Sequence, residues 1–177
     1  LLVFDGANGE FLANVSKASR KDARDAVVAA RAAQPGWASA TAYNRGQVLY
    51  RIAEVMEGRR DQFVDEITSL IGCSKKKATK EVDATIDRWV WYAGWSDKLS
   101  SIFGATNQVS GPYYNFTTPE PLGIVAALAP EKSSLLGLVQ CIAPILVAGN
   151  TCVAIASESR PLPAITLAEV IATSDVP

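Results

Sequence analysis

The spacing of hydrophobic and polar residues changes several times along the chain, and each change predicts a different kind of element. Residues 1–16 contain two short apolar runs around a cluster of Asp, Gly and Asn, which predicts a β-hairpin. Over residues 19–99 apolar side chains recur every three or four positions, which predicts amphipathic helices. From residue 101 the spacing falls to two, and residues 121–158 are almost uniformly apolar outside one short charged stretch.

The first predicted helix has a clear start signal and a clear stop signal. It begins at Ser19, whose hydroxyl suits an N-cap, and runs to Gln34. Pro35 and Gly36 are expected to stop it, because proline lacks the N–H that the helix needs and glycine is a poor helix former. Trp37 is then expected to fold back onto the core.

Three more helices follow, with turn residues between them. They are expected over residues 43–57, 60–71 and 74–99. Arg45 is expected on the water-facing side of the first of these, and Gly72 supplies a left-handed stop for the second. The aromatic run from Trp89 to Trp95 has helical spacing, which favours a packing surface over a platform for stacking bases.

Residues 101–120 are polar and aromatic and are punctuated by glycine and proline, which predicts an extended hairpin or arm. An arm with exposed Tyr113, Tyr114 and Phe116 would suit a subunit interface, where aromatic anchors contribute most. A hairpin that covers its own domain is the alternative. The sequence leaves the two open.

Residues 121–158 have the pattern of a βαβ unit. Its strand, helix and second strand are expected over residues 122–129, 135–148 and 151–155. The first strand suits burial on both faces of a parallel sheet, and Gly149 suits a left-handed helix cap. Ligands bind beyond the carboxyl ends of such strands, so residues 129–134 and 156–158 are the candidate binding loops. A final amphipathic helix is expected over residues 161–173, with an apolar side formed by Ile165, Leu167, Ala168 and Ile171.

Composition and charge exclude several classes of function. The chain has 177 residues, which fits one domain or most of one, and a net charge of -1, which argues against a nucleic-acid partner. There is no histidine, so a Ser-His-Asp triad, a Cys-His pair and the usual zinc ligand sets are absent, and no metal site is expected. Irregularly spaced cysteines, no signal peptide and no apolar run of about 20 residues indicate a cytoplasmic protein without a membrane partner.

A resemblance to a known family rests on short phrases that occur in one order along the chain. They are residues 25–33 with Trp37, residues 45–52, Glu81-Val82, Tyr92-Ala93-Gly94, residues 120–125, Ala143-Pro144 and residues 148–151. Together they resemble the N-terminal, nucleotide-binding side of the aldehyde dehydrogenase superfamily, and the resemblance covers essentially the whole chain.

The resemblance implies an α/β fold, in which N-terminal helices and the βαβ units of a Rossmann-like parallel sheet carry a β-hairpin oligomerisation arm. It implies a hairpin and helical part over residues 1–100, the arm over residues 101–120, and the first βαβα part of the nucleotide-binding domain over residues 121–177, all in one partial domain. It also implies NAD(P)-dependent oxidation of a small-molecule aldehyde to a carboxylic acid, and a homo-oligomer formed through the arm.

The first candidate loop departs from the family pattern. After the first strand the family usually has Pro-Trp-Asn-Phe-Pro, whose Asn helps to hold the oxyanion of the tetrahedral intermediate. Here Pro130 is kept and Lys132 stands at the position of the Asn, which makes Lys132 the candidate catalytic residue. Lysine is a flexible, strongly hydrated point charge, and loss of an oxyanion donor typically lowers the rate by about 10²–10³.

The second candidate loop departs from the family as well. After the second strand the family usually has Lys-Pro-Ser-Glu, whose Lys and Glu bind the adenosine ribose. Here Glu158 can still accept hydrogen bonds from ribose hydroxyls, whereas Ile155 offers apolar contact only. Loss of that charged contact would weaken cofactor binding by roughly tenfold to a hundredfold. The resemblance gives as cofactor-binding candidates Ala129, Pro130, Lys132, Ser157 and Glu158.

Two hypotheses follow from the resemblance. The first is a piece of an NAD(P)-dependent aldehyde dehydrogenase, favoured by a start at Leu1 and an abrupt end at Pro177; the family's nucleophilic Cys and general-base Glu would lie beyond this end. Cys73, Cys141 and Cys152 are expected to be inert packing in two helices and a buried strand. The second hypothesis is a non-catalytic pseudoenzyme or interaction module of the same fold, in which NAD or NADP binds weakly or not at all.

Overall fold

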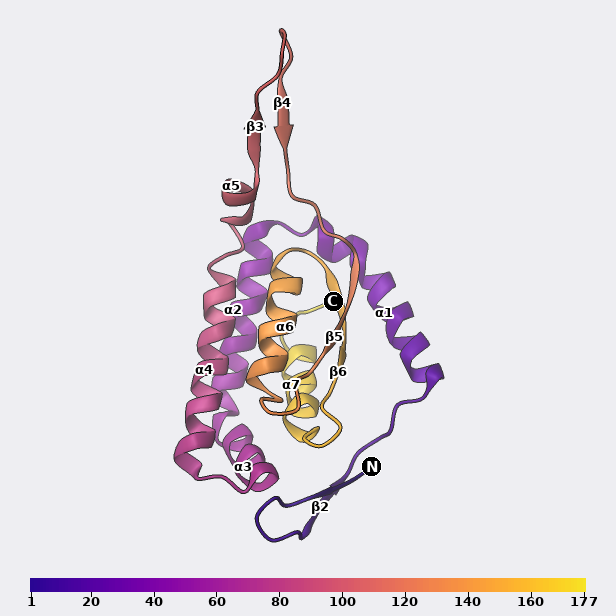
Figure 1. Ribbon diagram of the computed structural model, residues 1–177, viewed down its shortest axis with the longest axis vertical. Coiled ribbons are helices and arrows are strands. Elements are labelled where there is room, and N and C mark those ends of the chain that lie inside the picture. Colours follow the sequence, from indigo (N-terminus) through magenta and orange to yellow (C-terminus); the bar gives the residue numbers. More distant parts are fainter.

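The computed structural model describes residues 1–177 and has two visibly different parts, a body of helices and short strands and a long hairpin that projects from it (Figure 1). The elements in chain order are β1 Leu2–Phe4, β2 Phe11–Asn14, α1 Arg20–Ser39, α2 Ala42–Gly58, α3 Arg60–Ile71, α4 Lys75–Ala93, α5 Leu99–Phe103, β3 Ala105–Asn107, β4 Asn115–Thr117, β5 Ile124–Leu128, α6 Leu136–Val147, β6 Thr151–Ile155 and α7 Leu162–Ala172. No helix among them is both long enough and apolar enough to cross a bilayer.

The βαβ prediction is confirmed. β5 and β6 pair in parallel, with Ile124 opposite Thr151 and Leu128 opposite Ile155, and α6 is the connection between them. Gly149 follows α6 with a φ of 83°, the left-handed conformation expected of a glycine cap. β1 and β2 also form the expected antiparallel hairpin.

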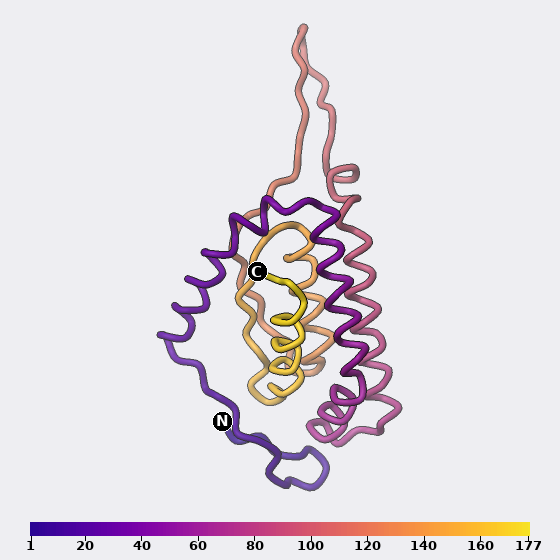
Figure 2. Tube along the Cα trace, turned by 180° about the vertical axis from the view of Figure 1, so that it is seen from behind, coloured from indigo at the N-terminus to yellow at the C-terminus, as the bar shows by residue number.

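The core lies between the helices and the parallel strands. α6 packs against α2 and α4 and also contacts β5 and β6, while α1 contacts the two strands from its own side. α7 contacts α2 and α3, and Figure 2 shows from behind that α1 stands apart from the other helices. A cluster of 22 buried residues runs through α2, α3, α4, α6 and α7. Helices α2, α3 and α4 therefore form a platform beside α6, and α1 covers the strands of the βαβ unit separately.

The predicted burial of β5 on both faces is wrong. Ala127 is the one buried residue of this strand, and Leu128 is largely exposed. The elements that contact β5 are β6, α6 and α1, and they leave the last residue of the strand open. The last residues of both strands, Leu128 and Ile155, are therefore exposed.

The predicted end of the first helix is also wrong, because α1 continues through Pro35 and Gly36 to Ser39. Tertiary contacts hold this last turn in place. The indole nitrogen of Trp37 donates to the carbonyl oxygen of Leu146 at 2.9 Å, and the Trp37 side chain is buried, as expected. A proline in a helix costs one backbone hydrogen bond, which this buried anchor offsets.

The start of α1 is where the sequence placed it. The Ser19 hydroxyl accepts hydrogen bonds from the backbone N–H groups of Lys21 and Asp22, and the Asp22 carboxylate accepts one from the Ser19 N–H at 2.7 Å. This reciprocal pair is a capping box. The hydrogen bond from the Ser19 backbone is the main reason that the pKa of Asp22 lies below its usual range.

Replacement of Ser19 by alanine is expected to lower the free energy of unfolding by about 1 kcal/mol, because two N–H groups of the first turn lose their acceptor. Urea denaturation followed by circular dichroism measures the change. Ser39→Ala serves as the control: its hydroxyl donates to the Gly36 carbonyl at the other end of the same helix, where water can replace it. Equal losses in the two variants would contradict the capping account.

Arg45 does not lie in water, contrary to expectation. Its side chain is partly buried, and its Nε donates to the carbonyl oxygen of Val147 at 3.1 Å. Its Nη1 donates to the carbonyl oxygen of Ala40 at 2.5 Å. The guanidinium therefore donates hydrogen bonds to backbone carbonyls at the ends of α6 and α1. Helical periodicity cannot reveal this role, because Val147 is remote in sequence and Ala40 lies outside the helix that carries Arg45.

Three smaller corrections concern element ends and faces. α4 stops at Ala93, six residues before the predicted end, and a turn leads to the short α5. Cys73 lies in the loop between α3 and α4, whereas a helix was expected. Of the apolar side predicted for α7, Leu167 is buried but Ile165 and Ala168 are exposed. The buried residues of α7 are instead Pro163, Thr166, Leu167 and Val170.

The hairpin over residues 105–120 does not cover its own domain. Every residue in this range is exposed, and β3 and β4 pair with each other in an isolated two-stranded sheet. Figure 1 shows the hairpin extending well beyond the end of α5. Of the two alternatives that the sequence left open, the projecting arm is the observed one.

Candidate functional site

The candidate site consists of two loops that leave the sheet side by side. The first loop, residues 129–135, follows β5, and the second, residues 156–161, follows β6. The N–H of Ala129 donates to the carbonyl oxygen of Ile155 at 2.9 Å, which extends the ladder of the parallel pair to the start of the loops. All the candidate residues predicted from the sequence are brought to this one edge.

Pro130 shapes the start of the first loop. Its ring lies directly against Gly137 in the first turn of α6, where a Cβ would collide with the Cγ of the proline and lie 3.0 Å from its Cδ. Glycine at this position lets the loop return tightly over the helix. The loop is thereby fixed at both ends, by the strand ladder at Ala129 and by the contact between Pro130 and Gly137.

Glu131 joins the first loop to the second. Its Oε2 accepts hydrogen bonds from the hydroxyl of Ser157 at 2.7 Å and from the hydroxyl of Ser159. Its Oε1 accepts one from the backbone N–H of Glu158 at 3.3 Å. We call this set of contacts, made by Glu131 to Ser157, Glu158 and Ser159, the Glu131 clasp. In this clasp, three hydrogen-bond donors of the second loop are paired with one carboxylate of the first loop.

A further contact runs between the loops in the opposite direction. The Nη1 of Arg160 donates to the carbonyl oxygen of Lys132 at 3.1 Å, and the N–H of Arg160 donates to the hydroxyl oxygen of Ser157 at 3.1 Å. Ser157 is buried beneath these contacts. The two loops are thus held together from both sides, and Ser157 is the shared centre.

The Glu131 clasp changes the acid-base behaviour of its carboxylate. Hydrogen bonds from Ser159 and then Ser157 hold the pKa of Glu131 below its ordinary value of 4.5. A carboxyl group with a lowered pKa stabilises the fold above its ordinary pKa, and that contribution is lost as the pH falls through the lowered value. Near neutral pH the clasp is therefore formed by an ionised carboxylate.

Lys132, the predicted catalytic candidate, has no partner for its charge. Its side chain is exposed, and its ammonium group forms neither a hydrogen bond nor an ion pair. Of the following residues, Ser133 donates to the Oε1 of Glu81 at 3.3 Å and Ser134 is buried. Nothing in the loop orients the Lys132 ammonium toward a fixed point, which an oxyanion donor requires.

The residues present do not fit NAD or NADP in the way the family pattern implies. Ile155 is exposed and offers no hydrogen-bond donor, and the N–H of Glu158 and the hydroxyls of Ser157 and Ser159 are taken by Glu131. The Glu158 carboxylate is exposed and forms no ion pair. A ribose or phosphate would have to displace an ionised carboxylate to reach these donors.

None of the cysteines has the character of a nucleophile. All three are free and only partly exposed. Burial, and then the neighbouring Cys141, raises the pKa of the Cys152 thiol to about 11, so this thiol is protonated near neutral pH. No group of three or more His, Cys, Asp or Glu residues is placed to hold a metal ion.

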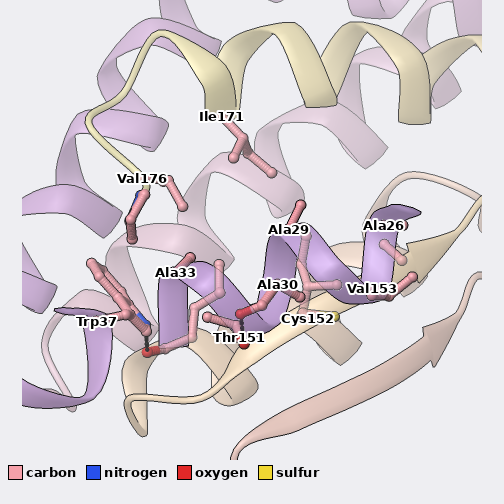
Figure 3. A pocket seen from close by; sticks show the side chains of 14 residues that line it. Ala26, Ala29, Ala30, Ala33, Trp37, Thr151, Cys152, Val153, Ile171 and Val176 are labelled. Carbon is pink, nitrogen blue, oxygen red and sulfur yellow. Dashed lines mark hydrogen bonds between the residues drawn. The ribbon is translucent and has the colours of Figure 1, made fainter. Parts of the chain in front are cut away.

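A separate apolar cavity of about 450 Å³ lies between α1, β6 and the C-terminal residues (Figure 3). Alanines of α1, with Ala26, Ala30 and Ala33 among them, form one wall, and residues of β6 form the other. Trp37 closes one end through its hydrogen bond to Leu146. Its lining is almost entirely apolar, and the one thiol in it, that of Cys152, is protonated near neutral pH.

The sequence reasoning missed three residues of the site, namely Glu131, Ser159 and Arg160. Each acts across the gap between two loops that are more than 20 residues apart along the chain. One feature of the sequence points to them: Glu131 is a carboxylate in an otherwise apolar βαβ unit, and Ser157, Glu158 and Ser159 place two hydroxyls beside a free N–H at the end of the next strand.

Comparison with known proteins gives a consistent result. The family model described as the aldehyde dehydrogenase family matches residues 1–177. The chain is 32% identical to aldehyde dehydrogenase, cytosolic 1, of Elephantulus edwardii over 99% of its length, and 35% identical to human retinal dehydrogenase 2, also over 99%. It spans about 35% and 34% of the lengths of these two relatives.

A solved structure of betaine aldehyde dehydrogenase from Staphylococcus aureus, in complex with NAD+, superposes with a TM-score of 0.93 at 27% identity. The superposition covers all of this chain and 36% of that protein. Family model, sequence relatives and structure thus agree along the full 177 residues, with the N-terminal portion of one fold. The chain belongs to the aldehyde dehydrogenase family.

Proposed function

We propose that the whole protein is a subunit of aldehyde dehydrogenase fold that assembles with further copies through its arm and no longer uses NAD(P) in the family's manner. The observation that carries this proposal is the Glu131 clasp, which takes up the loop donors at the edge where a dinucleotide would bind. Residues 1–100 then act as the helical platform, residues 101–120 as the assembly arm, and residues 121–177 as the first part of a nucleotide-binding domain whose binding edge is closed.

We infer that the predicted site residues are remnants of a cofactor site. Ala129 and Pro130 keep their structural places, at the strand ladder and against Gly137. Lys132 replaces a fixed neutral amide by a mobile charge, and Ser157 and Glu158 give their donors to Glu131. A cytoplasmic location goes with this proposal, supported by the cytosolic relative.

The arm supports assembly because it exposes aromatic side chains that have no contact with the body. Tyr114 is 77% exposed, and its ring lies 5.4 Å from the ring of Phe116, so the two form one apolar face. β3 and β4 are three residues each and both have an unpaired edge. Free strand edges and exposed aromatics are the features by which a hairpin joins a second chain, and a second copy is the partner we propose.

Replacement of both Tyr114 and Phe116 by serine is expected to dissociate the oligomer. Each buried aromatic anchor of an interface contributes about 2 kcal/mol to the binding free energy. Loss of both is therefore expected to raise the dissociation constant of the oligomer by about 10³-fold. Multi-angle light scattering of the full-length protein measures the change in mass. The matched control is Tyr43→Ser, since Tyr43 on α2 is 71% exposed but lies on the body. A wild-type protein that is already monomeric, or a double variant that keeps its mass, would refute the role of the arm.

NAD(P)-dependent oxidation of an aldehyde to a carboxylic acid is the second candidate function. The NAD+ complex of the Staphylococcus aureus relative favours it. In that case the nucleophile must come from outside residues 1–177, because the Cys152 thiol is protonated and the other two cysteines are partly buried. Aldehyde-dependent formation of NADH or NADPH by the full-length protein, followed at the absorbance of the reduced nicotinamide, separates the two candidates.

A further inference from the structure

In the Glu131 clasp, a side chain of the protein occupies hydrogen-bond donors of the kind that bind a ligand. A carboxylate of the first loop is bound by two hydroxyls and one backbone N–H of the second, with distances of 2.7 Å from Ser157 and 3.3 Å from the Glu158 N–H. These are the donor types that bind the oxygens of a ribose or a phosphate at the end of a parallel strand. The bound group here is supplied by the protein itself.

The surroundings fix the Ser157 end of this contact, whereas the Glu131 side chain is exposed. Ser157 is buried, and its hydroxyl is held in place because it also accepts the N–H of Arg160 at 3.1 Å. Arg160 in turn fastens the first loop through the carbonyl of Lys132. A hydrogen bond to a charged acceptor is about twice as strong as one between neutral groups, so the ionised Glu131 competes well for these donors.

A dinucleotide is a poor competitor for the same donors. Its pyrophosphate carries negative charge, and it would approach a carboxylate that is already in the donor set, with the unpaired Glu158 carboxylate beside it. Its ribose would offer neutral hydroxyls in exchange for an ionised carboxylate. Both parts of the cofactor therefore meet a site that is filled and has the wrong charge.

We propose that Glu131 is an internal lock on the cofactor edge: its carboxylate occupies the donors of Ser157, Glu158 and Ser159 and thereby excludes dinucleotides from the ends of β5 and β6. This inference rests on the proposed function and names the residue that determines the loss of NAD. Removal of this one side chain frees three hydrogen-bond donors and takes away one negative charge, and it leaves the two strands unaltered.

The test is a calorimetric titration of the full-length protein with NAD, comparing wild type with Glu131→Ala. The variant is expected to bind NAD at least about tenfold more tightly, the equivalent of one charged hydrogen-bond contact. Glu131→Gln, which keeps the volume of the side chain, replaces the alanine variant if that variant does not fold, with a gain expected in the same direction. The matched control is Glu54→Ala, which removes an exposed carboxylate on α2 that forms no side-chain hydrogen bond or ion pair and leaves the Glu131 clasp intact.

The lock is overturned if Glu131→Ala binds NAD no more tightly than wild type, or if Glu54→Ala produces the same gain. A second readout does not depend on NAD: amide hydrogen exchange at Glu158 should be at least about tenfold faster in Glu131→Ala, because its N–H loses its acceptor. Unchanged exchange would also overturn the lock. Aldehyde-dependent reduction of NAD or NADP by the wild-type protein would refute both the proposed function and the lock. A monomeric wild-type protein that binds no NAD would refute the assembly role of the arm alone, and a Glu131→Ala variant with no gain in NAD affinity would refute the lock alone.

Discussion

Replacement of Trp89 by alanine is expected to lower the free energy of unfolding by about 3 kcal/mol, toward the lower end of the range for a buried aromatic. Trp89 is 0% exposed and lies on α4 where this helix packs against α2 and α6. Its indole N–H has no hydrogen-bond partner, so the substitution also removes a buried unpaired donor, which offsets part of the loss. Urea denaturation followed by circular dichroism measures the change.

Trp91 provides the matched control, two residues away on the same helix. It is 46% exposed and contacts the ring of Trp95, with centroids 5.4 Å apart, and the guanidinium of Arg88. Loss of such half-exposed contacts is expected to cost about 1 kcal/mol or less. Similar losses in the two variants would show that the Trp89 face of α4 is not the core that the fold requires.

Replacement of Gly137 by alanine is expected to destabilise the protein by about 1–3 kcal/mol, because the new methyl group collides with the ring of Pro130. Proline is a stiff neighbour that cannot turn aside, so the loop that carries Glu131 must move. Amide hydrogen exchange at Glu158 should therefore be faster in the same variant, because the Glu158 N–H donates to the Glu131 carboxylate that this loop carries. Circular dichroism in urea and hydrogen exchange measure the two effects.

Gly36 is the matched control for this glycine. It lies within α1, and nothing stands within 4 Å of the position that its Cβ would take. Alanine there is expected to stabilise the protein by roughly 0.5–1 kcal/mol, since glycine is the poorer helix former. If Gly137→Ala stabilised the protein in the same way, the contact between Pro130 and α6 would not be the tight one described here.

The local pattern of the sequence was enough to predict the helices and the βαβ unit. The third predicted helix, over residues 60–71, has the same range as the observed α3. Gly72, which ends it, has a φ of 64°. The Ser19 cap was also predicted correctly. These features depend on side chains within one turn of each other, so that periodicity and capping chemistry contain the necessary information.

The features that sequence reasoning missed depend on partners far along the chain. Pro35 and Gly36 argue for a helix end, but Trp37 and its bond to the carbonyl of Leu146 decide the outcome. Arg45 has the spacing of a surface residue and instead serves the carbonyl of Val147. Local preference is a weak prior that tertiary contacts override.

The candidate site divides in the same way. The rule that ligands bind beyond parallel strand ends located both loops, and the structure brings them together. The Glu131 clasp was not predicted, since a carboxylate in one loop and hydroxyls in another have no shared pattern until the strands are paired. The change from the family's residues at Lys132 and Ile155 was visible in the sequence, whereas the group that fills the edge was not.

We propose that this member of the aldehyde dehydrogenase family keeps the fold and does not hold the dinucleotide. Calorimetric titration of the wild-type, full-length protein with NAD and with NADP tests it most directly. We predict no saturable binding up to millimolar concentrations, equivalent to a binding free energy weaker than about -4 kcal/mol. A micromolar dissociation constant for either nucleotide would contradict the claim.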